Sequence, residues 1–147
     1  MRLFPLTAAA LIAASPALAE FEETRSAHSV ATTIDRLEEA VTAAGATVFA
    51  RVNHAEGAAS VDMDLPAAEV LIFGNPKLGT QAMQADITAG LLLPMRALAY
   101  EDADGQVWLT WQEPEDMFDD LDIDDDADYL DQMEKALETL AGKATGD

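Results

Sequence analysis

The stretch Val70-Leu71-Ile72-Phe73-Gly74-Asn75-Pro76-Lys77-Leu78-Gly79-Thr80 is the strongest fold signal in the chain. Its four leading apolar residues predict a buried strand. Gly74, Asn75 and Pro76 then predict a turn, because Gly and Asn tolerate turn geometry and Pro has no N–H to donate to a neighbouring strand. Thr80 is a candidate N-cap for the helix that follows. A strand that leads through a turn into a helix leaves free N–H groups at one place, which suits an anion or a polar ligand.

Composition and charge limit the classes of function. The chain has 147 residues, which is the size of one domain, and half of them are apolar. Its 28 acidic residues outnumber its 8 Lys and Arg residues, for a formal net charge of −20. Such a charge repels phosphate backbones and anionic headgroups, so neither nucleic acid nor a membrane surface is an expected partner. The absence of cysteine excludes disulfides, thiolate ligands, a Cys nucleophile and covalent haem attachment.

The first 19 residues have the organisation of an export signal. Arg2 supplies positive charge, residues 3–14 form a short apolar run, and Ala17-Leu18-Ala19 fits the small-x-small rule for cleavage after Ala19. The apolar run is shorter than the roughly 20 residues of a membrane span. We therefore expect residues 1–19 to be a signal peptide, and the mature protein to be periplasmic or secreted without stable membrane insertion.

Strand signals are spread over the rest of the chain. The clearest is a hairpin joined by the turn Glu101-Asp102-Ala103-Asp104-Gly105, where Gly105 can take a positive φ. On its returning strand, Val107, Leu109 and Trp111 share one face, and Trp108 lies on the other. The expected strands are residues 25–31, 46–53, 70–73, 95–100 and 106–111.

Three helices are expected between and after these strands. The first has Thr32 as its N-cap and ends at Gly45, the second runs from Thr80 towards Pro94, and the third ends at Gly142. A short helical turn is expected at residues 55–60. Apolar residues recur at spacings of three and four on one face of each helix: Ile34, Leu37, Val41 and Ala44; Met83, Ile87 and Leu91; and Leu130, Met133, Leu137 and Leu140.

The order β, α, β, β, α, β, β, α predicts an α+β fold, in which an antiparallel sheet has its helices packed on one face. We assign residues 20–114 to the core of the domain. Residues 115–147 form an acidic segment and a C-terminal helix that complete it.

Several blocks of the sequence resemble the domain of unknown function 302 family. They are Val48-Phe49-Ala50-x-Val52-x-His54-x-x-Gly57-Ala58, Phe73-Gly74-Asn75-Pro76-Lys77-x-Gly79-Thr80, Leu93-Pro94, Tyr100-Glu101-Asp102-x-x-Gly105-x-Val107-Trp108 and Glu113-Pro114. The resemblance covers roughly residues 22–114. It implies a compact α+β fold of the TATA-binding-protein-like class and a homodimer, and it implies no activity. The chain departs from the family in having Met117-Phe118-Asp119-Asp120 where relatives have basic residues.

The best candidate polar site combines His54 and Glu56 with Asn75, Lys77 and Thr80. If the strands that precede His54 and Asn75 pair, the two turns could lie together. His54 would then be a general base or ligand, Asn75 a donor, and Lys77 with the helix at Thr80 an anion site. The alternative is structural: Asn75 caps a turn, Lys77 is solvated and His54 bonds locally.

Other chemistry has little support in the sequence. No Gly-x-Ser-x-Gly elbow is present, and no serine has a convincing partner, so we assign no catalytic residue and no cofactor. His28 and His54 could meet across strands, but two ligands are too few for a copper or zinc site. Tyr100, Trp108 and Trp111 could form a binding face, although such residues are more often core or dimer contacts.

The acidic run offers a separate hypothesis. Asp120, Asp122, Asp124, Asp126, Asp128 and Asp131 fall at positions 1, 3, 5, 7, 9 and 12 of a calcium-loop template. The template also requires Gly at position 6 and Glu at position 12, where this chain has Asp125 and Asp131. An acidic segment that precedes a helix N-terminus is the simpler interpretation.

These observations favour an exported, non-catalytic homodimer that binds a small ligand or a protein partner. Two alternatives remain. One is an enzyme that uses His54 and Glu56 with an anion site at Asn75, Lys77 and Thr80. The other is a divalent-cation binder that uses residues 120–131.

Overall fold

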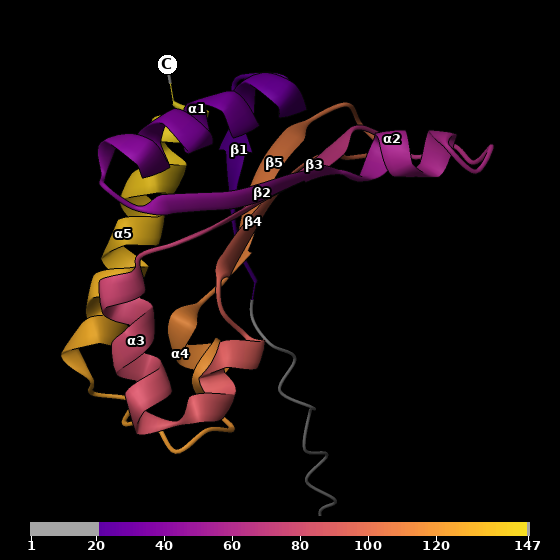
Figure 1. Cartoon of the computed structure of the whole chain (residues 1–147). Coiled ribbons are helices and arrows are strands. Elements are labelled where there is room, and N and C mark those ends of the chain that lie inside the picture. The colour runs from indigo at the N-terminus through magenta and orange to yellow at the C-terminus, as the bar shows by residue number, and fades with distance from the viewer. Residues whose placement is uncertain (1–20, 147) are drawn as a thin grey trace, which may run out of the picture.

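A five-stranded antiparallel sheet with the strand order β1-β5-β4-β3-β2 forms the centre of the fold (Figure 1). The computed structural model describes residues 21–146, so the expected signal peptide, residues 1–19, lies outside the described residues. The strands are β1 (Phe21–Ser26), β2 (Thr47–Asn53), β3 (Ala68–Gly74), β4 (Met95–Glu101) and β5 (Val107–Gln112).

Helices cover one face and occupy both ends of this sheet (Figure 1). The long helices α1 (Val30–Ala43) and α5 (Asp128–Thr145) lie over one face. The helix α3 (Pro76–Ala85), the 3₁₀ helix η1 (Ile87–Leu91) and α4 (Pro114–Phe118) lie at the end where β3 and β5 finish. The short helix α2 (His54–Ala59) projects beyond the opposite end.

The core lies between the sheet and the two long helices. Buried strand residues alternate with half-buried or exposed ones along β3, β4 and β5, as period-two geometry requires. The predicted α+β class, with an antiparallel sheet and helices on one face, is confirmed. The core side chains from the strands are Leu71, Phe73, Met95, Ala97, Ala99, Val107, Leu109 and Trp111, and those from the helices include Ile34, Leu37, Val41, Leu130, Met133, Leu137 and Leu140.

The predicted hairpin is present as β4 and β5. Tyr100 pairs with Trp108 across the two strands, on the face opposite to the buried Trp111. Gly105 has φ 77°, the positive value that the turn requires. Gly45, which follows α1, has φ 73° and ends that helix as expected.

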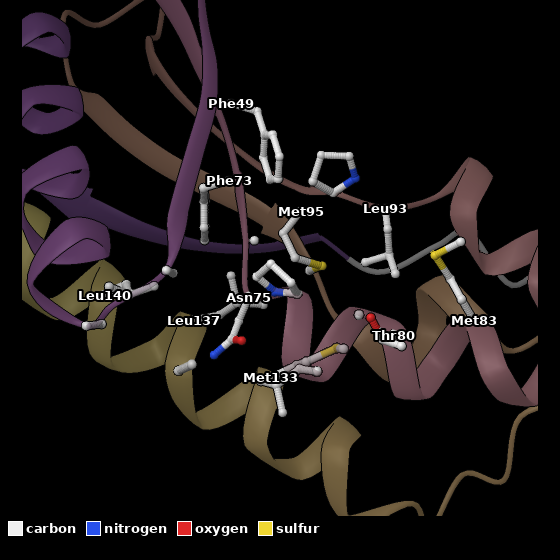
Figure 2. Close-up of a pocket in the computed structure, with 18 of the residues that line it drawn as sticks. Phe49, Phe73, Asn75, Thr80, Met83, Leu93, Met95, Met133, Leu137 and Leu140 are labelled. Carbon is white, nitrogen blue, oxygen red and sulfur yellow. The ribbon is translucent and has the colours of Figure 1, made fainter.

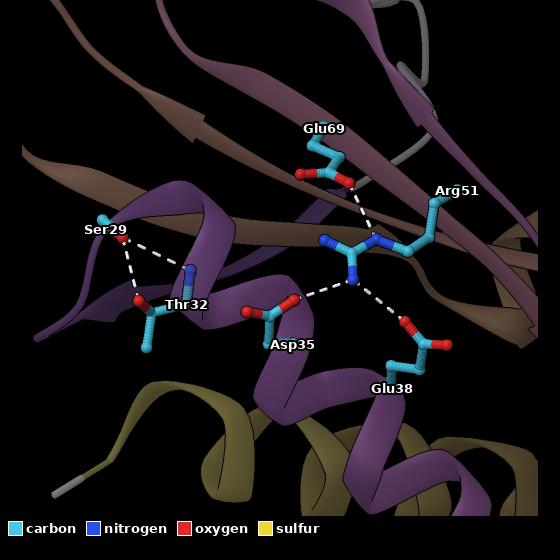
Figure 3. Close-up of polar contacts among 6 residues, drawn as sticks. All are labelled: Ser29, Thr32, Asp35, Glu38, Arg51 and Glu69. Atoms are coloured by element: carbon cyan, nitrogen blue, oxygen red, sulfur yellow. Dashed lines mark hydrogen bonds and ion pairs between the residues drawn. The ribbon is translucent and has the colours of Figure 1, made fainter.

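The N-terminus of α1 differs from the prediction. Ser29, not Thr32, is the N-cap, because its Oγ accepts a hydrogen bond of 3.3 Å from the Thr32 N–H (Figure 3). Val30 is therefore already helical, and the preceding strand is Phe21–Ser26 instead of residues 25–31. The sequence pattern placed this strand too late because the strand lies at a sheet edge and is mostly exposed, so its residues show no apolar alternation.

The helix after β3 also begins earlier than expected. Asn75, not Thr80, is its N-cap: Oδ1 of Asn75 accepts a 3.0 Å hydrogen bond from the Lys77 N–H, and Pro76 takes the first helical position. The expected helix from Thr80 to Pro94 is two elements, because Asp86 ends α3 and caps η1.

The prediction of a single apolar face on that helix is therefore wrong in part. Met83 is half-buried in α3, but Ile87 and Leu91 belong to η1 and are 72% and 85% exposed. The break at Asp86 changes the helical phase, so the spacing of four no longer places these residues on one face.

The last helix continues past Gly142 to Thr145. Its C-terminal carbonyls have partners from the first helix: the Arg36 guanidinium donates to Lys143 O at 3.0 Å and to Gly146 O at 2.6 Å. The ring Nε2 of His28 lies 2.9 Å from Gly146 O. These contacts satisfy groups that a helix end leaves unpaired, and they join α5 to α1.

A charged network joins β2 to β3 and α1 (Figure 3). Arg51 Nη1 donates to Asp35 at 2.7 Å and to Glu38 at 3.0 Å, and its Nε donates to Glu69 at 2.8 Å. The hydrogen bonds to Glu69 and then to Asp35 raise the pKa of Arg51 above its ordinary value. The network therefore stabilises the charged form of the guanidinium.

Candidate functional site

The two halves of the candidate polar site lie at opposite ends of the sheet. Strands β2 and β3 are antiparallel, with Asn53 opposite Glu69 and Thr47 opposite Gly74. His54 therefore follows β2 at one end, and Asn75 follows β3 at the other, about 20 Å away for a seven-residue strand. The expectation that these turns meet is wrong, and the enzyme hypothesis that combined them has no support in the geometry.

His54 lies in a local structural setting. It is the exposed first residue of α2, whose N-cap Asn53 accepts a 3.0 Å hydrogen bond from the Glu56 N–H. His28 follows β1, which is at the opposite edge of the sheet from β2, about 19 Å away across four strand spacings. The two histidines thus do not approach each other.

The acidic run does not form a convergent site. Between residues 21 and 146, no group of three or more His, Asp or Glu side chains is arranged to hold a metal ion. The Asp residues of the run are exposed, and the segment is held by the buried Ile123 and by a 3.2 Å hydrogen bond from the Asp122 N–H to Asp86 Oδ2. The calcium-loop spacing therefore has no matching geometry here.

A cavity of about 520 Å³ lies at the end of the sheet where β3 leads into α3 (Figure 2). The walls of the cavity come from the start of β2 and the end of β3, from α3 and the segment before β4, and from α5. The lining residues are Ala44, Ala46, Phe49, Phe73, Gly74, Asn75, Pro76, Leu78, Gly79, Thr80, Met83, Gly90, Leu93, Pro94, Met95, Met133, Ala136, Leu137 and Leu140.

Small residues keep this cavity open. A Cβ on Gly90 would come within 3.0 Å of Met83 Cε, and one on Gly79 within 3.4 Å of Leu93 Cδ1. Ala44, Ala46 and Ala136 likewise add little volume to the wall. Because α3 begins as early as Pro76, its first two turns, instead of a loop, lie along one side of the cavity.

The wall is apolar except at two side chains. No charged residue lines the cavity, although the chain has a net charge of −20. Asn75 and Thr80 supply the side-chain polar groups, and both are exposed, so they lie at the mouth (Figure 2). Lys77, the remaining predicted ligand-binding residue, is exposed on the first turn of α3 and is not part of the lining.

Three methionines contribute to the wall: Met83 from α3, Met95 from β4 and Met133 from α5 (Figure 2). Their side chains are unbranched and polarizable, so they adapt to apolar groups of different shape. The sequence patterns indicated Met133, Leu137 and Leu140 as a core face. They could not show that part of this face borders a cavity, because the other wall residues lie at least 38 residues earlier in the sequence.

Two carboxyl groups, Glu113 before α4 and Glu134 on α5, have altered titration. Burial raises the pKa of each, and repulsion from neighbouring carboxylates raises it further. Among the neighbouring carboxylates, that of Glu134 raises the pKa of Glu113 the most. Neither lines the cavity.

The second surface of interest is the sheet face opposite α1 and α5. Val70, Ile72, Leu98, Tyr100 and Trp108 point to this face and are only half-buried, and no helix of the described part of the chain covers it (Figure 1). The Arg25 guanidinium lies 5.7 Å from the centre of the Trp108 ring. The loop after α2 adds exposed apolar side chains at Val61, Met63 and Leu65 beyond the end of this face.

The structure is that of a small α+β domain with an apolar cavity at one end of its sheet. The chain belongs to the family described as domain of unknown function DUF302, whose sequence model matches residues 22–140. The crystal structure of an uncharacterized conserved DUF302 protein from Bacillus stearothermophilus has the same fold. Its TM-score is 0.76 at 18% sequence identity, and the match covers 84% of this chain and 97% of that chain.

Curated relatives with higher sequence identity carry the name fluoride-specific ion channel. The chain is 51% identical over 89 residues to fluoride-specific ion channel FluC 1 of Brucella suis biovar 1 and to FluC 2 of Brucella melitensis biotype 1. The match covers 60% of this chain but 35% and 33% of those proteins, so the chain spans about a third of their length. In residues 21–146, no helix is both long and apolar enough to cross a membrane.

Proposed function

We propose that this protein is a non-catalytic binding domain that holds a small apolar molecule in the cavity between α3, α5 and the end of the sheet. The observation that carries this proposal is the cavity itself, whose volume of about 520 Å³ and apolar wall are typical of small-molecule sites. Asn75 and Thr80 also belong to the candidate polar site that the sequence pattern indicated.

The character of the polar groups favours binding over catalysis. The side-chain groups at the cavity mouth are an amide and a hydroxyl, and neither titrates near neutral pH. General acid–base chemistry needs a group that exchanges protons at working pH. His54, the titratable residue that the enzyme hypothesis required, lies at the other end of the sheet.

Binding of Nile red, a neutral fluorophore that responds to apolar surroundings, tests the proposal. The variant Ala136→Leu fills the wall on α5 and should weaken Nile red binding at least 10-fold. Ala31→Leu makes the same change at an exposed position of α1 that does not line the cavity, and it should have no effect. Equal binding by the two variants, or no binding by the unaltered protein, would contradict the proposal.

We further propose that the protein is exported and acts as a homodimer. The segment of residues 1–19 supports export, and the uncovered sheet face with Leu98 and Trp108 supports self-association, because exposed apolar faces of this kind often mark interfaces. A native mass spectrum of protein from the periplasm tests both points. It should give a dimer whose chains begin at Glu20, and Leu98→Glu should give the monomer.

The curated relatives favour a second candidate function, as an accessory domain of a membrane ion channel. The supporting observation is the 51% identity over 89 residues to proteins named fluoride-specific ion channels, of which this chain matches only a part. Deleting the gene should then lower the fluoride tolerance of the host, and the tagged protein should retain a channel through detergent purification. Unchanged tolerance together with no retained membrane protein would remove this candidate.

A further inference from the structure

We infer that the cavity takes a neutral, largely hydrocarbon molecule with one hydrogen-bond acceptor oxygen, which receives a hydrogen bond from Nδ2 of Asn75. This inference rests on the proposed binding function and specifies the ligand class of the same site. It follows from the size of the cavity, from the charges around it, and from the fixed orientation of one amide.

The size of the cavity limits the ligand to a single chain or a small ring system. A volume of about 520 Å³ lies within the range of roughly 300–1,000 Å³ that is typical of sites for drug-sized ligands, so a single hydrocarbon chain or a fused ring system such as Nile red fits. Most of the wall consists of aliphatic, aromatic and methionine side chains that offer no hydrogen bond (Figure 2). A polar group buried against this wall would lose its hydrogen bonds with water without replacement.

Charge argues for a neutral ligand. An anionic ligand would approach a protein of net charge −20 and would find no cationic side chain in the lining. A cationic ligand would be attracted over a distance but would meet no carboxylate in the lining to replace its hydration. A neutral molecule has neither disadvantage.

The amide of Asn75 provides the specific contact. Its Oδ1 is fixed, because it accepts the hydrogen bond from the Lys77 N–H that caps α3. This contact also settles which amide atom is the nitrogen and directs Nδ2 away from the helix N-terminus (Figure 2). Nδ2 has no hydrogen-bond acceptor among residues 21–146, so it is available to an oxygen at the cavity mouth.

An oxygen held at the mouth would leave the hydrocarbon part inside. Thr80 lies a little over one helical turn after Asn75 and presents its hydroxyl at the same cavity. A carbonyl, ether or ester oxygen can accept a hydrogen bond from either group, whereas an ammonium group can accept from neither. The arrangement thus favours ketones, esters and similar neutral acceptors.

Displacement of Nile red by probes of equal chain length tests the ligand class. We expect 2-undecanone to bind at least 10-fold more tightly than either undecanoate or undecyltrimethylammonium. Equal or tighter binding of either ion would overturn the inference and leave the binding function intact. If Nile red itself does not bind, the proposed function fails first, so the two failures are distinguishable.

A single substitution isolates the amide. Asn75→Asp keeps the cap, because its carboxylate oxygen also accepts from the Lys77 N–H, but it replaces the Nδ2 donor with an acceptor. It should weaken 2-undecanone binding at least about 5-fold, the loss expected for one hydrogen bond. Binding of naphthalene, which has no acceptor oxygen, should change less than twofold.

Asn53→Asp is the matched control. Asn53 caps α2 with the same kind of hydrogen bond, to the Glu56 N–H, and lies at the far end of the sheet. It should leave the binding of both probes unchanged. Equal loss of ketone and naphthalene binding in Asn75→Asp, or no loss of either, would overturn the role of Asn75.

Discussion

Nε of Arg51 donates a 2.8 Å hydrogen bond to Oε1 of Glu69 on the neighbouring strand, and the Glu69 side chain is only 10% exposed. The carboxylate lies on the face of the sheet that packs against α1, where water cannot replace the guanidinium. Arg51 is 33% exposed and also contacts Asp35 and Glu38. This pair therefore joins the edge strand β2 to the rest of the fold.

We predict that Arg51→Met destabilises the protein by about 2 kcal/mol, because it leaves the buried Glu69 carboxylate without its partner. The partial exposure of Arg51 sets this value below that of a fully buried pair. Chemical denaturation measures the free energy of unfolding. Lys135→Met is the control, since the Lys135–Asp131 pair is exposed at both side chains and should contribute less than about 0.5 kcal/mol.

The double variant Arg51→Met/Glu69→Gln tests whether the loss of stability comes from the Arg51–Glu69 pair or from the loss of other Arg51 contacts. Because the second substitution removes the carboxylate that would otherwise be left unpaired, the double variant should be more stable than Arg51→Met alone. An equal or lower stability would show that the guanidinium acts through its contacts with Asp35 and Glu38 instead.

The N-cap of α1 gives a second prediction. Ser29→Ala should lower stability by about 1 kcal/mol, since it removes the oxygen that accepts from the Thr32 N–H. Thr32→Ala, at the position that the sequence pattern indicated, should cost less than half of that, because Thr32 is exposed and already inside the helix. Thermal unfolding of both variants shows which substitution lowers stability more. A larger loss for Thr32→Ala would indicate that Thr32 is the N-cap.

Mild acidification should stabilise the protein. The pKa values of Glu113 and Glu134 are raised above their ordinary value of 4.5, so the folded state binds protons more strongly than the unfolded chain. Their contribution to stability is fully present below pH 4.5 and is lost as the pH rises through the folded-state values. The melting temperature should therefore rise as the pH falls from 7 towards 4.5.

Below that range the trend should reverse. The pKa values of Asp86 and Asp102 lie below their ordinary value of 3.8, because Asp86 accepts hydrogen bonds from Thr88 and Asp102 accepts one from the Trp108 indole. The stability that they contribute is lost as the pH falls through these lowered values. The double variant Glu113→Gln/Glu134→Gln should weaken the dependence of the melting temperature on pH between 4.5 and 7. It should leave the decrease at lower pH unchanged.

Calcium should have no specific effect on stability. The acidic residues 119–131 are exposed and do not converge on a common point. Millimolar calcium should therefore raise the melting temperature no more than sodium chloride of matched ionic strength, through screening alone. A larger rise that disappears in Asp124→Asn/Asp126→Asn would restore the cation-binding hypothesis.

Local patterns in the sequence were sufficient to predict the fold class. The alternation in β5 placed Trp111 and Trp108 on opposite faces, as the structure has them, and the spacing of apolar residues in α5 identified its buried face. The family was also recognisable from the blocks around Asn75 and Tyr100. These features depend on residues close together in the chain, which periodicity describes well.

The site was only partly predictable, for a physical reason. Asn75 and Thr80 were indicated because a strand-to-helix turn has a local signature, whereas the cavity depends on the distance between α3 and α5. Pairing His54 with Asn75 failed because strand direction, which follows from the whole sheet, decides which turns share an end. The helix starts at Ser29 and Asn75 were missed although Ser and Asn are better N-caps than Thr, because residue type alone does not decide which of several possible caps a helix uses.

The methionine wall has a consequence for the chemical stability of the site. Oxidation turns a thioether into a sulfoxide, which is polar and chiral. Met83 is half-buried, whereas Met95 and Met133 are buried, so an oxidant would reach Met83 first. A single oxygen atom added there would place a strong dipole against the hydrocarbon part of the ligand. On the proposed function, the affinity of the cavity would therefore depend on the redox conditions outside the protein, even though the chain contains no cysteine.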